Sequence, residues 1–181
     1  MTLTRQVTAA TEGEFVGWTD PSTCASTANS GAATCPVTMS AAKTAAARFT
    51  VTCRLNVDGD SAVRSNTDTL MIARRILGMT GASVIAGAFN PLGTRITEAA
   101  LNAFIAPRIT ENRYDVNLDG VTDWRDAAIL LRTFSGFTGT AVTQGLITAG
   151  SQRKFWDQAT PTGSTDGIKQ YLNNRCAAAI L

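Results

Sequence analysis

The chain has 181 residues, of which 44% are hydrophobic and 17% are charged, enough for one or two small domains with apolar cores. A net charge of +2 excludes an extended basic face for nucleic acid or anionic lipid, and the absence of His removes the commonest general base and transition-metal ligand. No apolar run approaches the length of a membrane span, and residues 1–7 lack the hydrophobic segment of a signal peptide, so we expect a piece of a larger exported protein.

Residues 1–52 are rich in Thr, Val and Ala and show the alternation of β-strands. It is clearest in the stretches RQVTA, FVGW, PVTM and ARFTV, and no helical stripe is present. The order of a Gly-Trp pair, a loop bounded by cysteines, a Val-Thr-Met and an Ala-Lys before the last strand resembles the C-terminal part of the bacterial InlB B-type repeat of secreted surface proteins. The resemblance implies a small β-rich segment. A disordered Ala/Thr linker is the alternative, because STCASTANSGAATC has a low-complexity composition.

The chain has four cysteines but no CxxC pair and no His to complete a zinc site. This favours disulfides and an oxidising compartment. We expect Cys24 to pair with Cys35, because the loop between them has no large apolar side chain to hold it down. Such a bridge contributes about 3 kcal/mol in the chain-entropy model.

The stretch LNVDGDSAVRSNTD, residues 55–68, is the first loop. Loops around a hard cation such as Ca²⁺ place oxygen ligands at the first, third and fifth positions, a backbone carbonyl at the seventh and a carboxylate at the twelfth. In the first loop the sixth position is Ser61, the ninth is Arg64 and the closing carboxylate comes one residue late, so we expect a one-residue bulge and a weaker site. The predicted ligands are Asn56, Asp58, Asp60, the carbonyl of Ala62, and Asp68.

Helical patterns follow the first loop. TLMIARRILGMTG ends in a Gly-x-Thr-Gly, the stretch ASVIAG follows, and TEAALNAFI is a second helical pattern. We interpret Arg74 and Arg75, in IARRIL, as a solvated helix face.

The stretch YDVNLDGVTDWRD, residues 114–126, is the second loop and supplies the whole pattern without a gap. Gly120, at the sixth position, suits the sharp bend that such a loop needs. The predicted ligands are Asp115, Asn117, Asp119, the carbonyl of Val121, Asp123 and Asp126.

The segments after the second loop match those after the first. AAILLRTFSGFTG reaches its own Gly-x-Thr-Gly, TAVTQG matches ASVIAG, and STDGIKQYL matches TEAALNAFI after an insertion around SQRKFWDQA. We therefore divide the chain into a segment 1–52 and a domain 53–181 that contains two repeats, 55–108 and 114–176.

The acidic residues of the two loops have a simpler interpretation. Asp, Asn and Gly also dominate ordinary turns, and Asp68 or Asp126 could cap the helix that follows. However, seven of the 14 acidic residues lie in two short windows that recur in register with their helices. Carboxylates at this density repel one another, a cost that a divalent cation cancels. We therefore favour two Ca²⁺ sites.

The two repeats resemble dockerin type I repeats, the calcium-binding loop-helix modules of secreted bacterial proteins, with DVNLDGVTDWRD the closest match. The resemblance implies a mainly α fold in which two loop-helix repeats pair about a pseudo-two-fold. The loops lie farther apart than in compact dockerins, and each unit has an additional helix. The positions that would face a cohesin, Ser65 and Asn66 in one loop and Trp124 and Arg125 in the other, differ from the usual small hydroxyl pair. Calcium binding carries over from the family, and cohesin binding does not.

The pseudo-two-fold implies a second disulfide, between Cys53 and Cys176. It would bring the entry of the first repeat and the exit of the second side by side at the surface. The bridge would close a long loop and contribute about 4.7 kcal/mol in the chain-entropy model. Two unpaired thiols in a reduced protein are the alternative.

We expect a calcium-folded structural or protein-interaction module of a secreted or cell-surface protein, docking to another protein or to its parent polypeptide. A carbohydrate-binding or adhesive appendage of a larger secreted enzyme or adhesin is the alternative, with Trp18, Trp124, Trp156, Phe155 and Tyr171 as candidate aromatic contacts. We expect no enzymatic activity, because no Ser or Cys has a base in a recognisable motif. Self-cleavage at Asp20-Pro21 rests on a dipeptide alone. We expect no nucleic-acid partner and no membrane span.

Overall fold

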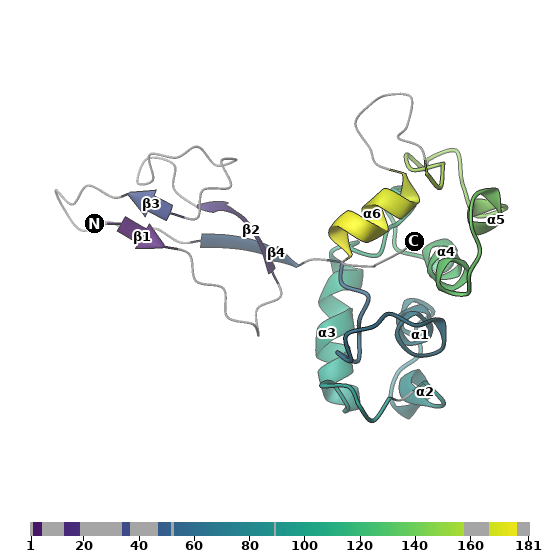
Figure 1. Cartoon of the computed structure of the whole chain (residues 1–181), viewed down its shortest axis with the longest axis horizontal. Coiled ribbons are helices and arrows are strands. Elements are labelled where there is room, and N and C mark those ends of the chain that lie inside the picture. The colour runs from purple at the N-terminus through teal and green to yellow at the C-terminus, as the bar shows by residue number, and fades with distance from the viewer. Residues whose placement is uncertain are drawn as a thin grey trace. The chain divides into compact units, whose positions relative to one another are not determined.

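The chain divides into two compact units, Met1–Thr52 and Cys53–Leu181. The computed structural model describes residues 53–88, 90–157 and 167–176, together with the backbone of four short strands in the first unit (Figure 1).

The strands of the first unit form two antiparallel pairs, β1 with β3 and β2 with β4. In the longer pair Gly13 lies opposite Val51 and Trp18 opposite Ala47, with a shift of register after Phe15. The predicted Cys24–Cys35 disulfide involves side chains outside the described residues. The strand bounds are Thr2–Thr4 for β1, Gly13–Trp18 for β2, Thr34–Pro36 for β3 and Ala47–Val51 for β4.

The described part of the second unit is helical, which confirms the mainly α prediction for these residues. Each half consists of an acidic loop, a helix, a one-turn helix and a third helix. The elements are the π turn η1 (Ser65–Thr69), α1 (Leu70–Ile76), α2 (Ala82–Ile85), α3 (Glu98–Thr110), α4 (Trp124–Phe134), α5 (Thr140–Thr143) and α6 (Ile168–Arg175).

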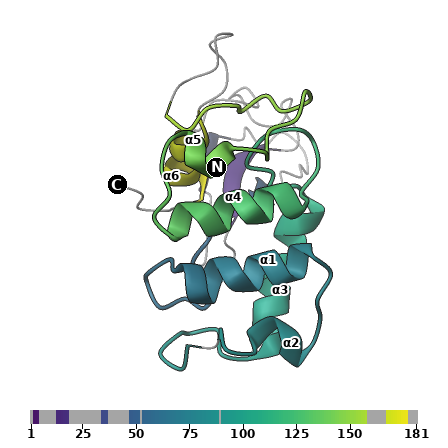
Figure 2. The same ribbon diagram turned by 90° about the vertical axis from the view of Figure 1, so that its right-hand side faces the viewer.

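The helices that follow the two loops, α1 and α4, pack side by side (Figure 2). The one-turn helix α2 packs against α1 and α3, and α5 packs against α4. This arrangement places the starts of α1 and α4, and therefore the loops that precede them, within one core.

The helix ends are set by the Gly-x-Thr-Gly motifs. Gly78 after α1 and Gly136 after α4 have φ angles of 83° and 90°, the left-handed conformation that ends many helices. The following amides close the turn, Met79 onto the carbonyl of Arg74 at 2.9 Å and Phe137 onto that of Arg132 at 3.0 Å. The chain then reverses into α2 or α5.

The interpretation of Arg74 and Arg75 as a solvated face is wrong. Nη1 of Arg74 donates to the carbonyls of Val84 at 2.9 Å and Ala86 at 2.7 Å, and Nη1 of Arg75 donates to the carbonyl of Met79 at 2.6 Å. Both residues lie near the C-terminal end of α1. Arg75 reaches a carbonyl of the turn that follows α1, and Arg74 reaches carbonyls at the C-terminal end of α2.

The core of the second unit includes residues that alternate with the predicted ligands. Leu55 and Val57 flank the first position of the first loop, and Tyr114 and Val116 flank that of the second; all four are fully buried. Because successive side chains of an extended segment point to opposite sides, burial of these four directs the intervening polar side chains away from the apolar core.

The structure joins Cys53 to Cys176, as predicted. Their Cα atoms lie 4.3 Å apart across a sequence separation of 123 residues. The amide of Leu55 also donates to the carbonyl of Cys176 at 3.3 Å. The chain segment that leads into the first loop is therefore tied to the end of α6 by one covalent bond and one hydrogen bond.

Candidate metal centres

The second loop folds around its own polar side chains. The carboxylate of Asp115 accepts hydrogen bonds from the amides of Asp119 at 3.1 Å and Gly120 at 2.8 Å. Oδ1 of Asn117 accepts from the amide of Asp119 at 2.9 Å, and Oδ1 of Asp119 accepts from that of Val121 at 3.1 Å. Gly120 has a φ of 93°, which accounts for a glycine at the sixth position.

Asp126 closes the second loop from its other end. Its Oδ1 accepts from the amides of Val116 at 2.8 Å and Asn117 at 3.3 Å, and its Oδ2 accepts from that of Asp123 at 2.9 Å. The bond to Asp123 belongs to a capping box at the start of α4, in which Asp123 accepts from the amide of Arg125. Helix capping accounts for Oδ2 of Asp126. It does not account for Oδ1, which holds the start of the loop.

The first loop has the same bonding pattern. Oδ1 of Asn56 accepts from the amides of Gly59 at 2.7 Å and Asp60 at 3.2 Å. Oδ1 of Asp58 accepts from the amide of Asp60 at 3.1 Å, and Oδ1 of Asp60 accepts from that of Ala62 at 2.9 Å. The first, third and fifth positions therefore fold both loops through side-chain bonds to amides farther along the loop.

Asp68 has the place in the first loop that Asp126 has in the second. Its Oδ1 accepts from the amides of Val57 at 2.7 Å and Asp58 at 3.2 Å, and its Oδ2 accepts from that of Arg64 at 3.0 Å. These donors are the second, third and ninth residues of the loop, as they are for Asp126.

The extra residue before Asp68 is taken up by the π turn η1. The amide of Thr69 bonds to the carbonyl of Arg64, five residues back, at 3.2 Å, whereas the amide of Ala127 bonds to that of Asp123, four residues back, at 3.2 Å. The predicted one-residue bulge is this π turn, which brings the late carboxylate into register.

Four carboxylates of the two loops are almost completely buried: Asp58, Asp68, Asp115 and Asp126. Among the described residues, none of the four forms an ion pair with Arg or Lys. Oδ2 of Asp58 is buried without a hydrogen-bond partner. Buried charge without a counter-charge is costly.

The pKa values reflect this cost. Burial raises the pKa of Asp126 to about 7, and the nearby carboxylate of Asp115 adds to the shift. Burial also raises the pKa of Asp115 and of Asp58, in the latter case with repulsion from Asp68. Oxygen donors of this kind suit a hard divalent cation, which would favour their ionised forms.

The loops differ most at the ninth position. In the first loop the guanidinium of Arg64 pairs with the carboxylate of Asp60, which also accepts from Nδ2 of Asn90 at 2.5 Å. A hydrogen bond from the amide of Ala62, together with Arg64, lowers the pKa of Asp60. In the second loop the ninth residue is Asp123, so this position contributes a negative charge instead of a positive one.

Residues outside the loops also contact them, and none of these residues is among the predicted ligands. The amide of Arg95 donates to the carbonyl of Asp58 at 2.8 Å, and the amide of Arg153 donates to that of Asn117 at 2.9 Å. The prediction that the insertion in the second repeat includes Arg153 is wrong. Arg153 lies as many residues after Arg95 as Gly136 lies after Gly78. The repeat therefore continues through Arg153, and the insertion follows it.

The carboxylates do not by themselves form a recognisable metal cluster. Within residues 53–88, 90–157 and 167–176, no three Asp, Glu, Cys or His side chains are grouped so that they could hold a metal ion. The predicted ligand sets are wider than acidic side chains. They also include the amide oxygens of Asn56 and Asn117 and the backbone carbonyls of Ala62 and Val121.

Comparison with known proteins adds no relative: no family model matches the chain, no curated protein matches its sequence and no solved structure matches its fold. The resemblance to dockerin type I repeats therefore rests on the loops and the segments that follow them.

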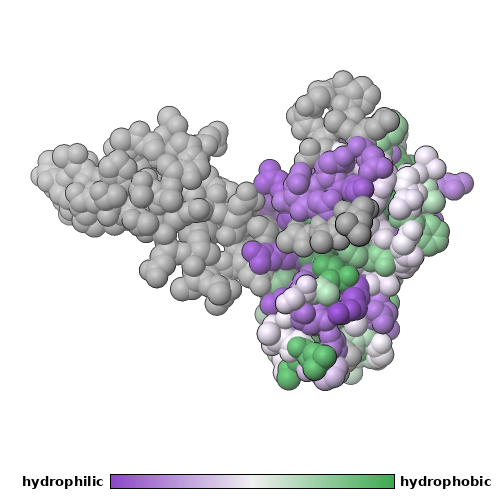
Figure 3. Space-filling model, in the orientation of Figure 1, coloured by the Kyte–Doolittle hydropathy of each residue, from purple (hydrophilic) through white to green (hydrophobic). Residues whose placement is uncertain are grey.

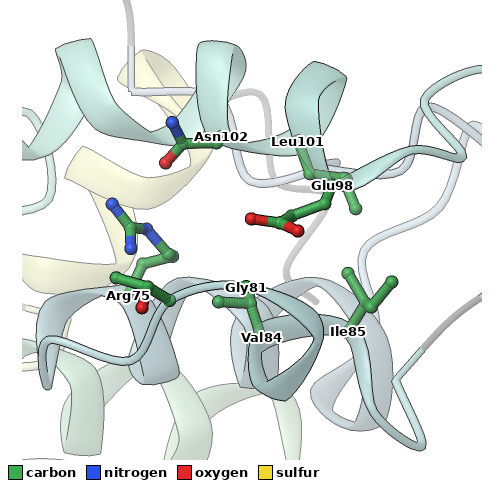
Figure 4. Close-up of a pocket in the computed structure, with 8 residues that line it drawn as sticks. Arg75, Gly81, Val84, Ile85, Glu98, Leu101 and Asn102 are labelled. Atoms are coloured by element: carbon green, nitrogen blue, oxygen red, sulfur yellow. The ribbon is translucent and has the colours of Figure 1, made fainter.

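A small pocket of about 150 Å³ lies between α1, α2 and α3 (Figure 4). Val84, Ile85 and Leu101 form its apolar side, and the side chains of Arg75 and Glu98 extend into the space between the helices. None of its lining residues belongs to either loop, and we assign no ligand to it.

The candidate aromatic contacts for carbohydrate do not share one environment. Trp156 is buried, and Tyr171 lies under the guanidinium of Arg153, whose Cζ is 3.8 Å from the ring centroid. Trp124 and Phe155 are exposed, whereas the side chain of Trp18 lies outside the described residues. The visible surface of α6 is mostly hydrophilic (Figure 3).

Proposed function

We propose that residues 53–181 form a calcium-binding module similar to paired dockerin type I repeats, folded and stabilised by two Ca²⁺. One ion would bind in each loop, and the two halves would be related by a pseudo-two-fold through the packed helices α1 and α4. The first unit would be the β-rich segment that precedes this module.

Burial of Asp58, Asp68, Asp115 and Asp126 without a cationic partner is the observation that carries the proposal. A bound Ca²⁺ supplies the missing positive charge and accepts oxygen ligands in flexible geometry. In the second loop the ligands would be Asp115, Asn117, Asp119, the carbonyl of Val121, Asp123 and Asp126. In the first they would be Asn56, Asp58, Asp60, the carbonyl of Ala62 and Asp68.

The disulfide supports a role outside the cytosol. Bridges such as Cys53–Cys176 persist in oxidising compartments, where extracellular calcium modules bind with dissociation constants of about 10⁻⁴–10⁻³ M. Within the described residues, no helix is long and apolar enough to cross a membrane. We propose a secreted or surface-exposed structural module that docks to another protein or to its parent polypeptide and has no catalytic role.

The test is calorimetric titration of calcium-depleted protein, combined with melting in calcium and in chelator. We expect two binding events and a higher Tm in calcium, with about 2.7 kcal/mol of added stability per site at calcium 100-fold above the dissociation constant. Magnesium should substitute poorly, because it requires a stricter octahedron. An identical Tm in calcium and in chelator would refute the proposal.

Two variants make the test specific. Asp119→Ala should remove one binding event. Asp157→Asn is the matched control, since Asp157 is exposed, lies outside both loops and pairs only loosely with Lys169 at 3.8 Å. This control should keep both binding events and the calcium-dependent rise in Tm.

A further inference from the structure

One arginine in each half contacts the backbone at the start of its loop. Nε of Arg95 donates to the carbonyl of Val57 at 2.6 Å, and its Nη2 donates to that of Asn56 at 2.8 Å. In the second half, Nη1 of Arg153 donates to the carbonyl of Asp115 at 3.1 Å. Because the main-chain amides of both arginines also bond to the third residue of their loops, each arginine contacts the first and third positions together.

The same two guanidinium groups stack on the third helix of their own half. Cζ of Arg95 lies 4.0 Å from the ring centroid of Phe104 on α3, and Cζ of Arg153 lies 3.8 Å from that of Tyr171 on α6. Stacking on an aromatic face limits the orientations of the guanidinium plane. The arginine is therefore held between a helix and a loop in both halves.

At the first position of each loop, the arginine donates to the backbone carbonyl, that of Asn56 in the first loop and of Asp115 in the second. The side-chain oxygens of Asn56 and Asp115 accept hydrogen bonds from loop amides. Each arginine thus fixes the path of the main chain beside the side-chain oxygen that the metal would use.

We propose that Arg95 and Arg153 are positioning residues that pre-organise the two metal loops, each for its own site. This inference rests on the proposed calcium binding. A loop without its arginine must order its first three residues when the ion binds, and this entropic cost lowers affinity. Groups that orient metal ligands typically change metal affinity by about 10- to 100-fold when they are removed.

The direction of the effect separates this role from simple electrostatics. A nearby positive charge repels a cation, so an arginine that acted only through its charge would weaken calcium binding, and its removal would tighten it. Pre-organisation predicts the opposite sign, namely weaker binding after removal.

The experiment is calcium titration of Arg95→Met and Arg153→Met in single-site backgrounds, with Asp126→Asn silencing the second loop and Asp68→Asn silencing the first. We expect each Met variant to lose about 10- to 100-fold in affinity at its own loop and to leave the other loop unchanged. Arg95→Lys and Arg153→Lys keep the charge but lose the planar fork, and should recover only part of the loss.

Arg74→Met and Arg132→Met are the matched controls. These arginines also donate to backbone carbonyls, Arg74 to that of Ala86 and Arg132 to that of Gln144, both beyond the loops. They should keep both calcium affinities within about twofold of wild type, far below the effect of removing a ligand-orienting group.

A second measurement does not depend on the ion. In calcium-depleted protein, Arg95→Met should speed amide hydrogen exchange in residues 57–60 and leave residues 116–120 unchanged, and Arg153→Met should do the reverse. If wild type binds calcium but the Met variants bind it equally well, bind it more tightly, or lose both sites together, the inference is wrong. If wild type binds no calcium, the proposed function itself fails.

Discussion

The two loops have the same pattern of hydrogen bonds to the backbone but differ in the side chains at the bend and at the ninth position. In both, side chains at the first, third and fifth positions bond to later amides, and the closing carboxylate bonds to the second, third and ninth amides. The second loop has glycine at the bend and Asp123 at the ninth position. The first has Ser61 at a φ of 75°, Arg64 at the ninth position and a π turn. The hydrogen-bonding pattern of the loop therefore tolerates substitutions that change the charge of the site.

The largest difference between the loops should appear when the closing carboxylates are neutralised. Asp126→Asn should abolish the proposed tighter calcium site and Asp68→Asn the proposed weaker one, because each removes a buried carboxylate that is a proposed ligand and also holds the start of its loop. At calcium 100-fold above each dissociation constant, the loss is about 2.7 kcal/mol per site. Calorimetric titration of both variants checks this. Two intact binding events in either variant would show that the carboxylate holds its loop without binding the ion.

The pH dependence of the calcium-depleted protein should come mainly from the second loop. The folded-state pKa of Asp126 is about 7, above its ordinary value near 4, so the folded state favours the protonated carboxyl. The free energy of unfolding should therefore be highest below about pH 4, and should fall as the pH rises through about 7.

Melting between pH 4 and pH 8 measures this fall. Saturating calcium should remove most of it, because the bound ion favours the carboxylate. In calcium-depleted protein, Asp126→Asn should flatten the profile, because it removes the carboxyl whose pKa burial raises to about 7. A wild-type profile that is flat without calcium would contradict the burial argument.

Arg64→Asp should make the first loop more like the second. The variant replaces the guanidinium beside Asp60 with a carboxylate at the position of Asp123. We expect calcium affinity at the first loop to rise by about tenfold, which corresponds to about 1.4 kcal/mol. Titration in the Asp126→Asn background isolates this site. Arg54→Gln, just before the loop, is the control for loss of positive charge alone, and should give a smaller change.

The smallest predicted effect concerns the bend. Ser61 has a φ of 75°, which costs an L-residue about 1–2 kcal/mol relative to glycine, whereas glycine loses about 0.5–1 kcal/mol through chain entropy. Ser61→Gly should therefore stabilise the calcium-depleted protein by roughly 0.5–1 kcal/mol. Ser65→Gly, in the π turn, should not stabilise it. Denaturant unfolding of both variants tests the difference, and a destabilised Ser61→Gly would locate the strain elsewhere.

The sequence predicted the features that depend on local spacing. The positions of Asn56 to Asp68 and Asp115 to Asp126 within the loops, the late closing carboxylate and the helices after each loop follow from residue order. The Cys53–Cys176 pair required the further step of placing two repeats about an axis. The calcium ions themselves, the Cys24–Cys35 bridge and the family resemblances stay predictions.

The features that were missed depend on contacts between segments. Arg95 and Arg153 each combine a stacking partner on a later helix with carbonyl partners on an earlier loop, and no local pattern shows such a combination. The interpretation of Arg74 fails because a polar position near a helix end looks the same in sequence whether it faces water or donates to carbonyls of the next helix. The insertion in the second repeat lies after Arg153. The match between TEAALNAFI and STDGIKQYL shows that extra residues precede the last helix, but it does not show where they begin.

The bridge between Cys53 and Cys176 also determines how the second unit would carry a mechanical load. The chain enters and leaves the described helices at Cα atoms only 4.3 Å apart. A pulling force applied to the chain on either side of the bridge passes through a single covalent bond, and the loops and helices between the two cysteines carry almost none of it. The two acidic loops would keep their geometry under a tension that stretches the chain on either side of the bridge. Reduction of the bridge would transfer that tension to the first loop.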